Sequence, residues 1–256
     1  MIIDKNNEYF TQAVKLYKDT FKDSDEFIKV VMESVICASV DIENNIVVSC
    51  AFAREKQIRK EKDIITFPFM FGIATNEKYR NKGKASKVIN EMFNYLKQKY
   101  NFTMLCPANS GLYEFYKKFG FEKLCFFKYE KVGDIIGEIK EGNLDDSKLI
   151  TDFFNNANLA YKEVQYRNVD ATKLKLQEIL SDSGKIYIVY KNKKAIGYML
   201  YDDFILESIG VEYREGTKYT LVKNSDIEEK TNNCPGVVIK KFKNENIEHL
   251  RFYEMW

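Results

Sequence analysis

Histidine is nearly missing from this chain of 256 residues, which contains only His249. Histidine is the commonest metal ligand in proteins and the general base of the Ser-His-Asp triad. A single copy therefore nearly excludes a metal site built on histidines, and it excludes a triad hydrolase unless His249 itself serves. Because His249 lies in a charged segment, we expect it at the surface without a catalytic role, and we predict no bound metal.

Long apolar runs and a surplus of one charge are also absent. The longest uncharged, apolar-rich run covers only residues 64–76, whereas a membrane span needs about 18–20 residues. Lysine and arginine number 40 against 38 aspartates and glutamates, a formal charge of +2. A dedicated nucleic-acid binder shows a large basic excess. We therefore expect neither a membrane partner nor a nucleic-acid partner.

Cysteine is scarce and shows no paired spacing. The five cysteines stand at positions 37, 50, 106, 125 and 234, an odd number that is typical of free thiols in a reducing compartment. The first residues reach Asp4 with no long apolar stretch behind it, so we expect no signal peptide. These features together predict a cytoplasmic protein.

Aromatic residues, in contrast, are abundant. The chain has 17 tyrosines and 19 phenylalanines, and 45% of its residues are hydrophobic. This composition supplies a large core and excludes intrinsic disorder as the main state. The length corresponds to one large domain or two small ones.

The first half of the chain alternates helical and strand patterns. Apolar residues at helical spacing predict the helices, while short runs rich in β-branched residues or phenylalanine predict the strands. In chain order we expect a helix at 8–21, a second helix after the capping residues 23–25, a hairpin of strands 34–41 and 46–53, a charged loop or ragged strand end at 54–63, a central strand at 64–75, a helix at 82–100, a strand at 102–106, a helix at 112–119 and a strand at 121–130.

The second half repeats the order of helices followed by strands. Residues 132–143 contain three glycines and are predicted to form a linker. Beyond them we expect helices at 149–157 and 171–181, a meander of strands at 185–190, 195–201 and 204–211, and a strand at 236–241. The recurring order is a hint of duplication, although no residue-level repeat accompanies it.

The junction between the central strand and the strongest helix carries the most specific signal. The pattern Arg80-x-x-Gly83-x-Ala85 places small residues at the helix start, where an anion can approach free backbone N–H groups. The helix dipole adds about 0.3–1 kcal/mol of attraction for negative charge. Four cationic side chains surround the turn: Arg80, Lys82, Lys84 and Lys87. The pattern predicts a phosphate cradle, but neither GxxxxGK[ST] nor GxGxxG is present, so it is not a nucleotide P-loop or a Rossmann fingerprint.

This junction resembles the pyrophosphate motif Arg/Gln-x-x-Gly-x-Gly/Ala of the GCN5-related N-acetyltransferase (GNAT) superfamily. A second pattern makes the resemblance more specific. The family continues with Asn-x-x-Ala-x-x-x-Tyr and then Gly-Phe, and the chain has Asn109, Leu112, Tyr116 and Gly120-Phe121 at those spacings. Leu112 stands where the family has a small residue. The resemblance covers residues 1–130, and it extends over 140–256 only as a candidate degenerate copy without the phosphate motif.

The resemblance implies an α/β (α+β) fold with a GNAT-like mixed, mostly antiparallel sheet flanked by helices and splayed where acetyl-CoA inserts. It also implies a second, smaller GNAT-like α/β domain that shapes the acceptor site. We accordingly predict a GNAT domain at 1–131, a linker at 132–143 and a degenerate GNAT-like domain at 144–256. The resemblance further points to an Eis-like or tandem-GNAT member.

The implied activity is transfer of the acetyl group of acetyl-CoA to a primary amine of a small molecule or peptide, by direct attack in a ternary complex. The central strand would pair with the pantetheine arm, and backbone amides of the following loop would hold the pyrophosphate. The residues implied to bind the cosubstrate are Phe71, Ile73, Ala74, Thr75, Arg80, Asn81, Lys82, Gly83, Lys84, Ala85, Ser86 and Asn109. Asn109 is equally well suited to cap the next helix.

The resemblance implies two candidate catalytic groups. The resemblance implies that Tyr116 lies near the sulfur, where its phenol could protonate the leaving thiolate, yet Tyr116 also lies on an apolar helix face and suits a packing role. Residues 64–75 contain no carboxylate, so the base common in the family is missing. The Eis-like branch uses a C-terminal carboxylate, which here would belong to Trp256.

Two other functions remain open. One is a non-catalytic, regulatory module that binds CoA, and the other is a Fem-type tandem-GNAT aminoacyl transferase. The match to the acetyl-CoA loop and the lack of a large basic surface count against the second. The acceptor amine and the oligomeric state are not indicated by the sequence, although acidic residues in 19–33 would favour a cationic acceptor if they line the groove.

Overall fold

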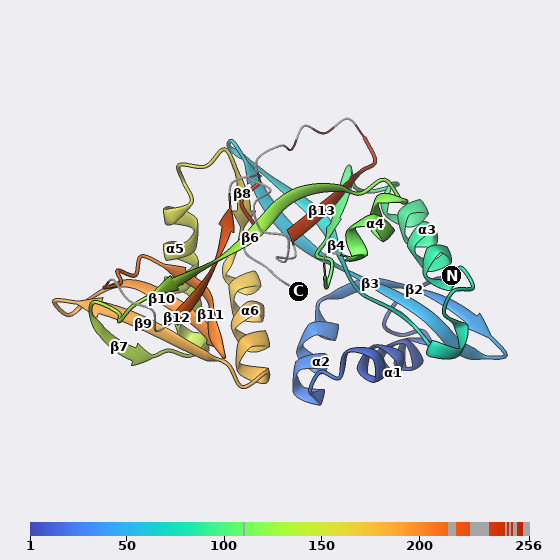
Figure 1. Cartoon of the computed structure of the whole chain (residues 1–256), viewed down its shortest axis with the longest axis horizontal. Helices are drawn as coiled ribbons and strands as arrows, with labels where there is room; N and C mark the ends of the chain where they lie inside the picture. Colours follow the sequence, from blue (N-terminus) through green and yellow to red (C-terminus); the bar gives the residue numbers. More distant parts are fainter. Residues whose placement is uncertain are drawn as a thin grey trace.

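The fold is built on one continuous, strongly twisted sheet with helices on its faces (Figure 1). The computed structural model describes residues 1–109, 111–214, 219–225, 236–243, 245, 247 and 250–252, with the backbone alone for 126–131 and 219–225. The strand order is β1-β2-β3-β4-β5-β13-β6-β12-β11-β10-β9-β7, and β8 pairs separately with β3. Within it only β4–β5 and β11–β12 are parallel, so the predicted mixed, mostly antiparallel sheet is confirmed.

The first half of the chain contains six of these strands and four helices. They are β1 (Ile2–Ile3), α1 (Phe10–Phe21), α2 (Asp25–Glu33), β2 (Val35–Glu43), β3 (Ile46–Lys60), β4 (Asp63–Thr75), the short 3-10 helix η1 (Glu77–Tyr79), α3 (Lys84–Leu96), β5 (Phe102–Leu105), α4 (Gly111–Lys117) and β6 (Glu122–Val132). All helices and strands predicted for this half are present.

The second half is dominated by two helices and a meander. Its elements are β7 (Glu138–Glu141), the 3-10 helix η2 (Leu144–Asp146), α5 (Ser147–Ala157), β8 (Glu163–Tyr166), α6 (Val169–Ser181), β9 (Lys185–Lys191), β10 (Lys194–Asp202), β11 (Phe204–Ile209), β12 (Tyr219–Ser225) and β13 (Gly236–Lys241). The predicted helices, the meander and the strand at 236–241 are confirmed.

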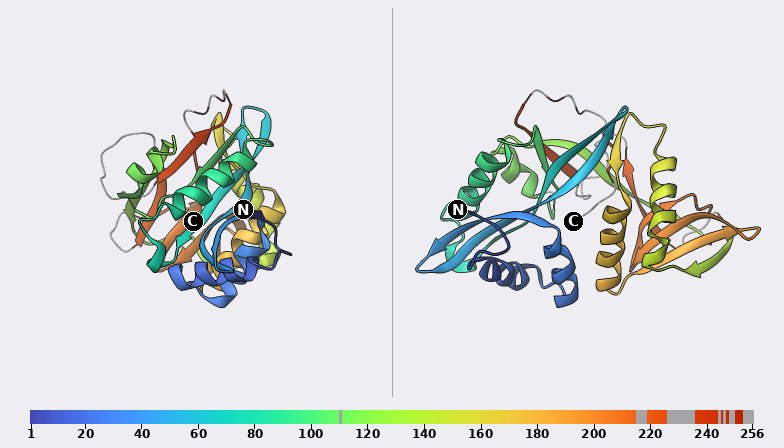
Figure 2. Two further views of the ribbon diagram at one scale, coloured as in Figure 1. Left: turned by 90° about the vertical axis from the view of Figure 1, so that its right-hand side faces the viewer. Right: turned by 180° about the vertical axis from the view of Figure 1, so that it is seen from behind.

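Strand β3 shows why helices cover both faces of the first half. Its residues alternate in direction, as side chains of a strand do. Cys50 and Phe52 pack with α1 and α2 on one face, whereas Ala51 and Ala53 pack with α3 and α4 on the other. Figure 2 shows the two helix layers on opposite sides of the strands. In the second half, α5 and α6 cover one face of the meander.

Two segments differ from the prediction. The charged stretch 54–63, expected as a loop or ragged end, continues β3 to Lys60 and turns directly into β4. The reason is that β8 pairs with this end of β3 and the buried Arg54 and Ile58 lie in it. The predicted linker contains β7, which pairs with β9. The division into domains at 1–131 and 144–256 stays a prediction.

The last strand returns to the first half of the chain. Strand β13 lies between β5 and β6 and pairs antiparallel with both. Strand β6 in turn continues beyond β13 and pairs with β12 of the second half. The two halves therefore share strands rather than meeting only at a surface.

Strand β4 bulges and parts from its neighbour. It pairs with β5 only at Phe69 and Met104, and beyond that point the two strands diverge. On the edge that pairs with β3, Cys50 opposes Ala74 and Phe52 opposes Phe71. Two residue steps along β3 therefore match three along β4, which is a β-bulge. Gly72 lies in the bulge with φ of 59°.

No helix in the described part of the chain combines the length and the apolar character needed to cross a membrane.

Replacing Gly72 by alanine is expected to destabilise the fold by about 2–4 kcal/mol. The new Cβ would lie 2.7 Å from a ring carbon of Tyr17, in addition to the strain of the positive φ. Gly83→Ala is the control, because Gly83 has φ of 73° and no atom within 4 Å of the added Cβ, so only about 1–2 kcal/mol of strain is expected. Urea unfolding measures both, and equal losses would contradict the packing argument.

Candidate functional site

The loop between β4 and α3 presents the start of a helix to open space. Asn81 and Gly83 both adopt left-handed backbone conformations, with φ of 61° and 73°. Gly83 serves as the N-cap of α3, and a Cβ added there would meet nothing within 4 Å. The left-handed residues turn the chain so that its amides follow one another around the helix end.

Six consecutive backbone N–H groups at this turn, those of residues 81–86, donate no hydrogen bond to any described residue. The first amides of a helix have no partner within the helix, and here no side chain caps them. They therefore form a ready site for an anion at the positive end of the α3 dipole. This is the arrangement that the motif Arg80-x-x-Gly83-x-Ala85 predicts.

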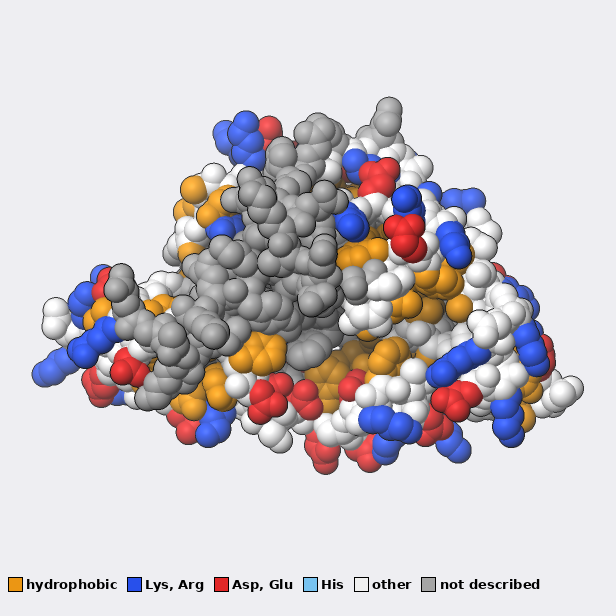
Figure 3. All heavy atoms as spheres, in the orientation of Figure 1, with side chains coloured by type: hydrophobic (Ala, Val, Ile, Leu, Met, Phe, Trp, Pro, Cys, Tyr) orange, Lys and Arg blue, Asp and Glu red, His pale blue; other side chains and the backbone are white. Residues whose placement is uncertain are grey.

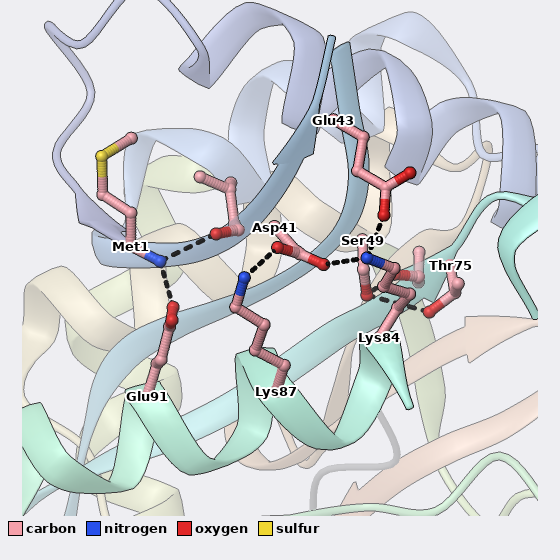
Figure 4. Close-up of polar contacts among 10 residues, drawn as sticks. Met1, Asp41, Glu43, Ser49, Thr75, Lys84, Lys87 and Glu91 are labelled. Atoms are coloured by element: carbon pink, nitrogen blue, oxygen red, sulfur yellow. Dashed lines mark hydrogen bonds and ion pairs between the residues drawn. The ribbon is translucent and has the colours of Figure 1, made fainter. Parts of the chain in front are cut away.

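The cations around the turn do not all face outward. Arg80 lies 3.5 Å from the carboxylate of Glu77 and donates from Nε to the carbonyl of Thr75 at 3.4 Å. The ammonium of Lys82 lies 5.5 Å from the ring centre of Tyr79. The side chains of Lys84 and Lys87 instead point from α3 toward β2, as Figure 4 shows.

Both Lys84 and Lys87 form ion pairs with Asp41. Its carboxylate is 2% exposed; Lys87 donates to Oδ1, and Nζ of Lys84 lies 3.0 Å from Oδ2. Lys84 also pairs with Glu43. Burial pushes the pKa of Asp41 upward, but the hydrogen bonds and charges of Lys87 and Lys84 outweigh it and hold that pKa below its usual value. The side chain of Lys84 thus anchors α3 to β2, while its backbone amide stays in the turn; its role toward phosphate stays a prediction.

A cavity of about 390 Å³ opens where β4 leaves β5. Its walls come from α1, α2, β3, β4, the segment after β5 and the C-cap of α6. Aromatic rings dominate the lining: Tyr17, Phe21, Phe27, Phe69 and Phe71. Its charged residues are Asp23, Arg54 and Asp182. The turn before α3 and this cavity lie at the two ends of one stretch of chain, residues 72–86.

Two polar contacts organise the cavity wall. Arg54 forms a buried ion pair with Glu178 of α6, each side chain being 2% exposed, and its guanidinium lies 5.3 Å from the ring centre of Phe71. Tyr17 donates its hydroxyl hydrogen to Asp23 at 2.5 Å. Burial, followed by the neighbouring Asp23 carboxylate, raises the pKa of Tyr17.

The remaining residues predicted on β4 are close to the cavity or to the turn. Phe71 lines the cavity, and Ala74 is buried against α1. Ile73 packs on the α3 face. Thr75 shares a hydrogen bond of 2.9 Å with the hydroxyl of Ser49. On the edge that faces β5, the backbone of residues 70–75 pairs with no strand among the described residues, because the pairing with β5 ends at Phe69.

Tyr116 does not line the cavity. Its side chain is 7% exposed and packs against Phe115 and Phe121. Burial and the nearby Cys106 raise the pKa of Tyr116 to about 12. Cys106 lines the cavity, so the phenol lies one side chain away from it.

Asn109 is exposed, one residue beyond Ala108 of the cavity wall. Its carbonyl accepts from the amide of Leu112 at 3.2 Å, and its side chain makes no hydrogen bond to another described residue. The predictions for Trp256 and His249 fall outside the described residues. In the described ranges, no group of three or more His, Cys, Asp or Glu residues is suited to a metal ion.

Sequence reasoning missed most of the charged cavity residues. Asp23 was recognised only as a capping residue, and Arg54 was assigned to a solvated loop. Nothing in the local sequence connects Arg54 with Glu178, which stands 124 positions later. The acidic character of residues 19–33 was the one available signal for Asp23.

Residues 2–124 match the family model described as an acetyltransferase (GNAT) domain. The fold is similar to that of a conserved protein from Enterococcus faecalis V583, described as a probable N-acyltransferase, with 16% identity, a TM-score of 0.71, and 95% of this chain and 72% of that chain covered. A GCN5-related N-acetyltransferase from Anabaena variabilis gives 11% identity, a TM-score of 0.68, and coverage of 95% and 73%. Saccharomyces cerevisiae N-myristoyltransferase with bound myristoyl-CoA is 11% identical, with a TM-score of 0.53. That match covers 88% of this chain and 63% of the other.

At these identities the likeness to solved structures shows the fold. The structures from Enterococcus faecalis V583 and Anabaena variabilis each match 95% of this chain, so both halves of the chain take part in that fold. No curated protein matches the chain in sequence.

Replacing Asp41 by asparagine is expected to lower the free energy of unfolding by about 1–2 kcal/mol at pH 7, because two ammonium groups lose a buried anionic partner. The folded pKa of Asp41 lies below its unfolded value, so its contribution is complete above about pH 4 and disappears as the pH falls through the folded pKa. Urea unfolding at pH 7 and pH 3 should show the difference shrinking in acid.

The exposed Asp63 at the start of β4 provides the control, since Asp63→Asn removes the same charge without a buried partner and should change little. A loss in Asp41→Asn that is the same at both pH values would show that packing, and not charge, is responsible.

Proposed function

Because the first half of the chain is a domain of the acetyltransferase (GNAT) family, as its resemblance predicted, we propose that the protein transfers the acetyl group of acetyl-CoA to a primary amine of a small molecule or peptide. The observation that carries this proposal is the run of six unpaired amides at the start of α3 beside the unpaired edge of β4. The Eis-like or tandem-GNAT subtype stays a prediction.

The two features suit the two polar parts of CoA. Backbone N–H groups at a helix start can bind a diphosphate. They supply hydrogen bonds, and no charged side chain has to be taken out of water. The pantetheine arm contains two amides that can pair with the free edge of β4 as an added strand does. We propose that the loop residues from Arg80 to Ser86 hold the diphosphate, with Lys84 acting through its amide, and that residues 71–75 hold the arm.

The acceptor would enter from the opposite side. The cavity reaches the bulge of β4 through Phe71 and Gly72, so an amine there could approach a thioester lying along that strand. Attack creates an oxyanion, which needs an N–H donor fixed in advance. The bulge turns backbone groups near Gly72 and Ile73 away from the regular ladder, and we propose that one of these amides serves.

The leaving thiolate requires a proton, and we propose Tyr116 as its source. Burial raises the pKa of Tyr116 to about 12, so the phenol keeps its proton throughout the neutral range and is present in the form that can donate. The contribution of the Trp256 carboxylate and a cytoplasmic location stay predictions.

Ser86→Asp is expected to weaken acetyl-CoA binding at least tenfold. The added carboxylate would lie in the first turn of α3, where it stabilises the helix but repels a diphosphate. Isothermal calorimetry at low ionic strength measures the affinity, and thermal unfolding confirms that the fold is kept.

Ser86→Asn is the matched control, since it has the same shape without the charge and should bind nearly as well as the original protein. If Ser86→Asp binds acetyl-CoA normally, or if no heat is seen with any variant, the diphosphate does not bind at this turn.

Tyr116→Phe is expected to reduce kcat by about 10²–10⁴ while leaving acetyl-CoA affinity unchanged, because the ring still fills its place in the core. Release of free thiol from acetyl-CoA with a panel of amines measures the rate. Tyr17→Phe provides the comparison, since Tyr17 is the tyrosine that lines the cavity.

A larger loss in Tyr17→Phe than in Tyr116→Phe would move the proton donor to Tyr17. Binding of acetyl-CoA without thiol release for every amine would instead favour the non-catalytic, regulatory module.

A further inference from the structure

We propose that the acceptor carries a second positive charge, and that Asp23 and Asp182 bind it at the mouth of the cavity between α2 and α6. This inference rests on the proposed function and names the substrate class: a diamine or polyamine with an apolar spacer. Asp182 would then be a specificity-determining residue contributed by the second half of the chain.

A hydrogen bond between the halves brings the two aspartates to neighbouring positions. Ser24, the N-cap of α2, donates its hydroxyl hydrogen to the carbonyl of Ser181, the last residue of α6, at 3.2 Å. Asp23 directly precedes Ser24, and Asp182 directly follows Ser181. Both residues line the same cavity. The positions of the two residues along the cavity wall are therefore set by contacts of the fold.

The mouth of the cavity has an uncompensated negative charge. Among the described residues, no lysine or arginine forms an ion pair with Asp23 or Asp182. Asp182 is also the C-cap of α6, where the helix dipole already places partial negative charge. Desolvation and the carboxylate of Asp23 raise the pKa of Asp182, and Asp182 in turn helps to raise the pKa of Asp202. A bound cation would relieve this repulsion.

The positive residue on the cavity does not cancel this charge. Arg54 is already paired with Glu178, and both side chains are nearly excluded from water. The rest of the wall is aromatic and apolar, which suits a methylene chain and allows an ammonium to lie over a ring face. In Figure 3, acidic side chains gather at the lower middle of the molecule beside a hydrophobic hollow.

The reacting nitrogen itself cannot be the group that these carboxylates retain. An amine must lose its proton before it attacks a thioester, so the atom that reacts is neutral. A charge that persists through the reaction has to belong to a second group on the same molecule. Two carboxylates at the mouth, separated from the bulge of β4 by aromatic rings, match a molecule with charge at one end and a nucleophile at the other.

The test compares 1,4-diaminobutane with 1-aminobutane, which share a carbon chain and differ in the second ammonium. Thiol release from acetyl-CoA gives kcat/KM, and calorimetry with the CoA-loaded protein gives binding without turnover. We expect the diamine to be favoured at least tenfold, and Asp182→Asn to lower its kcat/KM and affinity about tenfold with 1-aminobutane unchanged. Asp170→Asn, which removes a charge from the exposed first turn of the same helix, should keep the preference.

Equal values for the two amines, or an equal loss of both in Asp182→Asn, would overturn the inference while leaving the transferase intact. If neither these two amines nor any other amine of the panel releases thiol, the proposed function fails, and calorimetry still decides the inference. Diamine binding that depends on Asp182 would then support a cation site, whereas its absence would exclude one.

Discussion

The parting of β4 from β5 is the constraint on which the rest of this molecule depends. The parallel strands β4 and β5 pair at a single register position. Beyond it the edge of β4 has no partner strand in the described part of the chain, and side chains line the gap without filling it. The bulge at Gly72 directs the strand away, and the buried network of Asp41 with Lys84 and Lys87 fixes the helix that follows. The turn before α3 and the cavity are thus both held at the ends of one stretch of chain.

Charge is distributed differently at those two ends. At the turn, Lys84 and Lys87 are paired with carboxylates of β2, so the helix start presents mainly its backbone amides. At the cavity, acidic residues from both halves meet with little compensation. The first end suits a polyanion held by dipoles, and the second suits a cation held by carboxylates and rings.

The sequence was sufficient for features that depend on near neighbours. The glycine at 83, the helical spacing after it and the pattern Asn109 to Phe121 identified the family and the start of α3, because dihedral angles and helix faces are local properties. The sequence did not predict the features that depend on pairing between distant segments. The charge of residues 54–63 resembled a solvated loop, yet β8 covers them, and Arg54 meets a partner 124 residues away. The lysine contacts with Asp41 likewise join segments 43 and 46 positions apart.

The position of β13 has a consequence for how the chain can reach this state. The gap between β5 and β6 is filled by residues 236–241, which are synthesised only after α5, α6 and the meander. A nascent chain that already contains the whole turn between β4 and α3 still lacks a strand in the middle of its first sheet. The hydrophobic faces beside β5 and β6 stay uncovered until β13 has been made, so the first sheet is completed only after most of the second half.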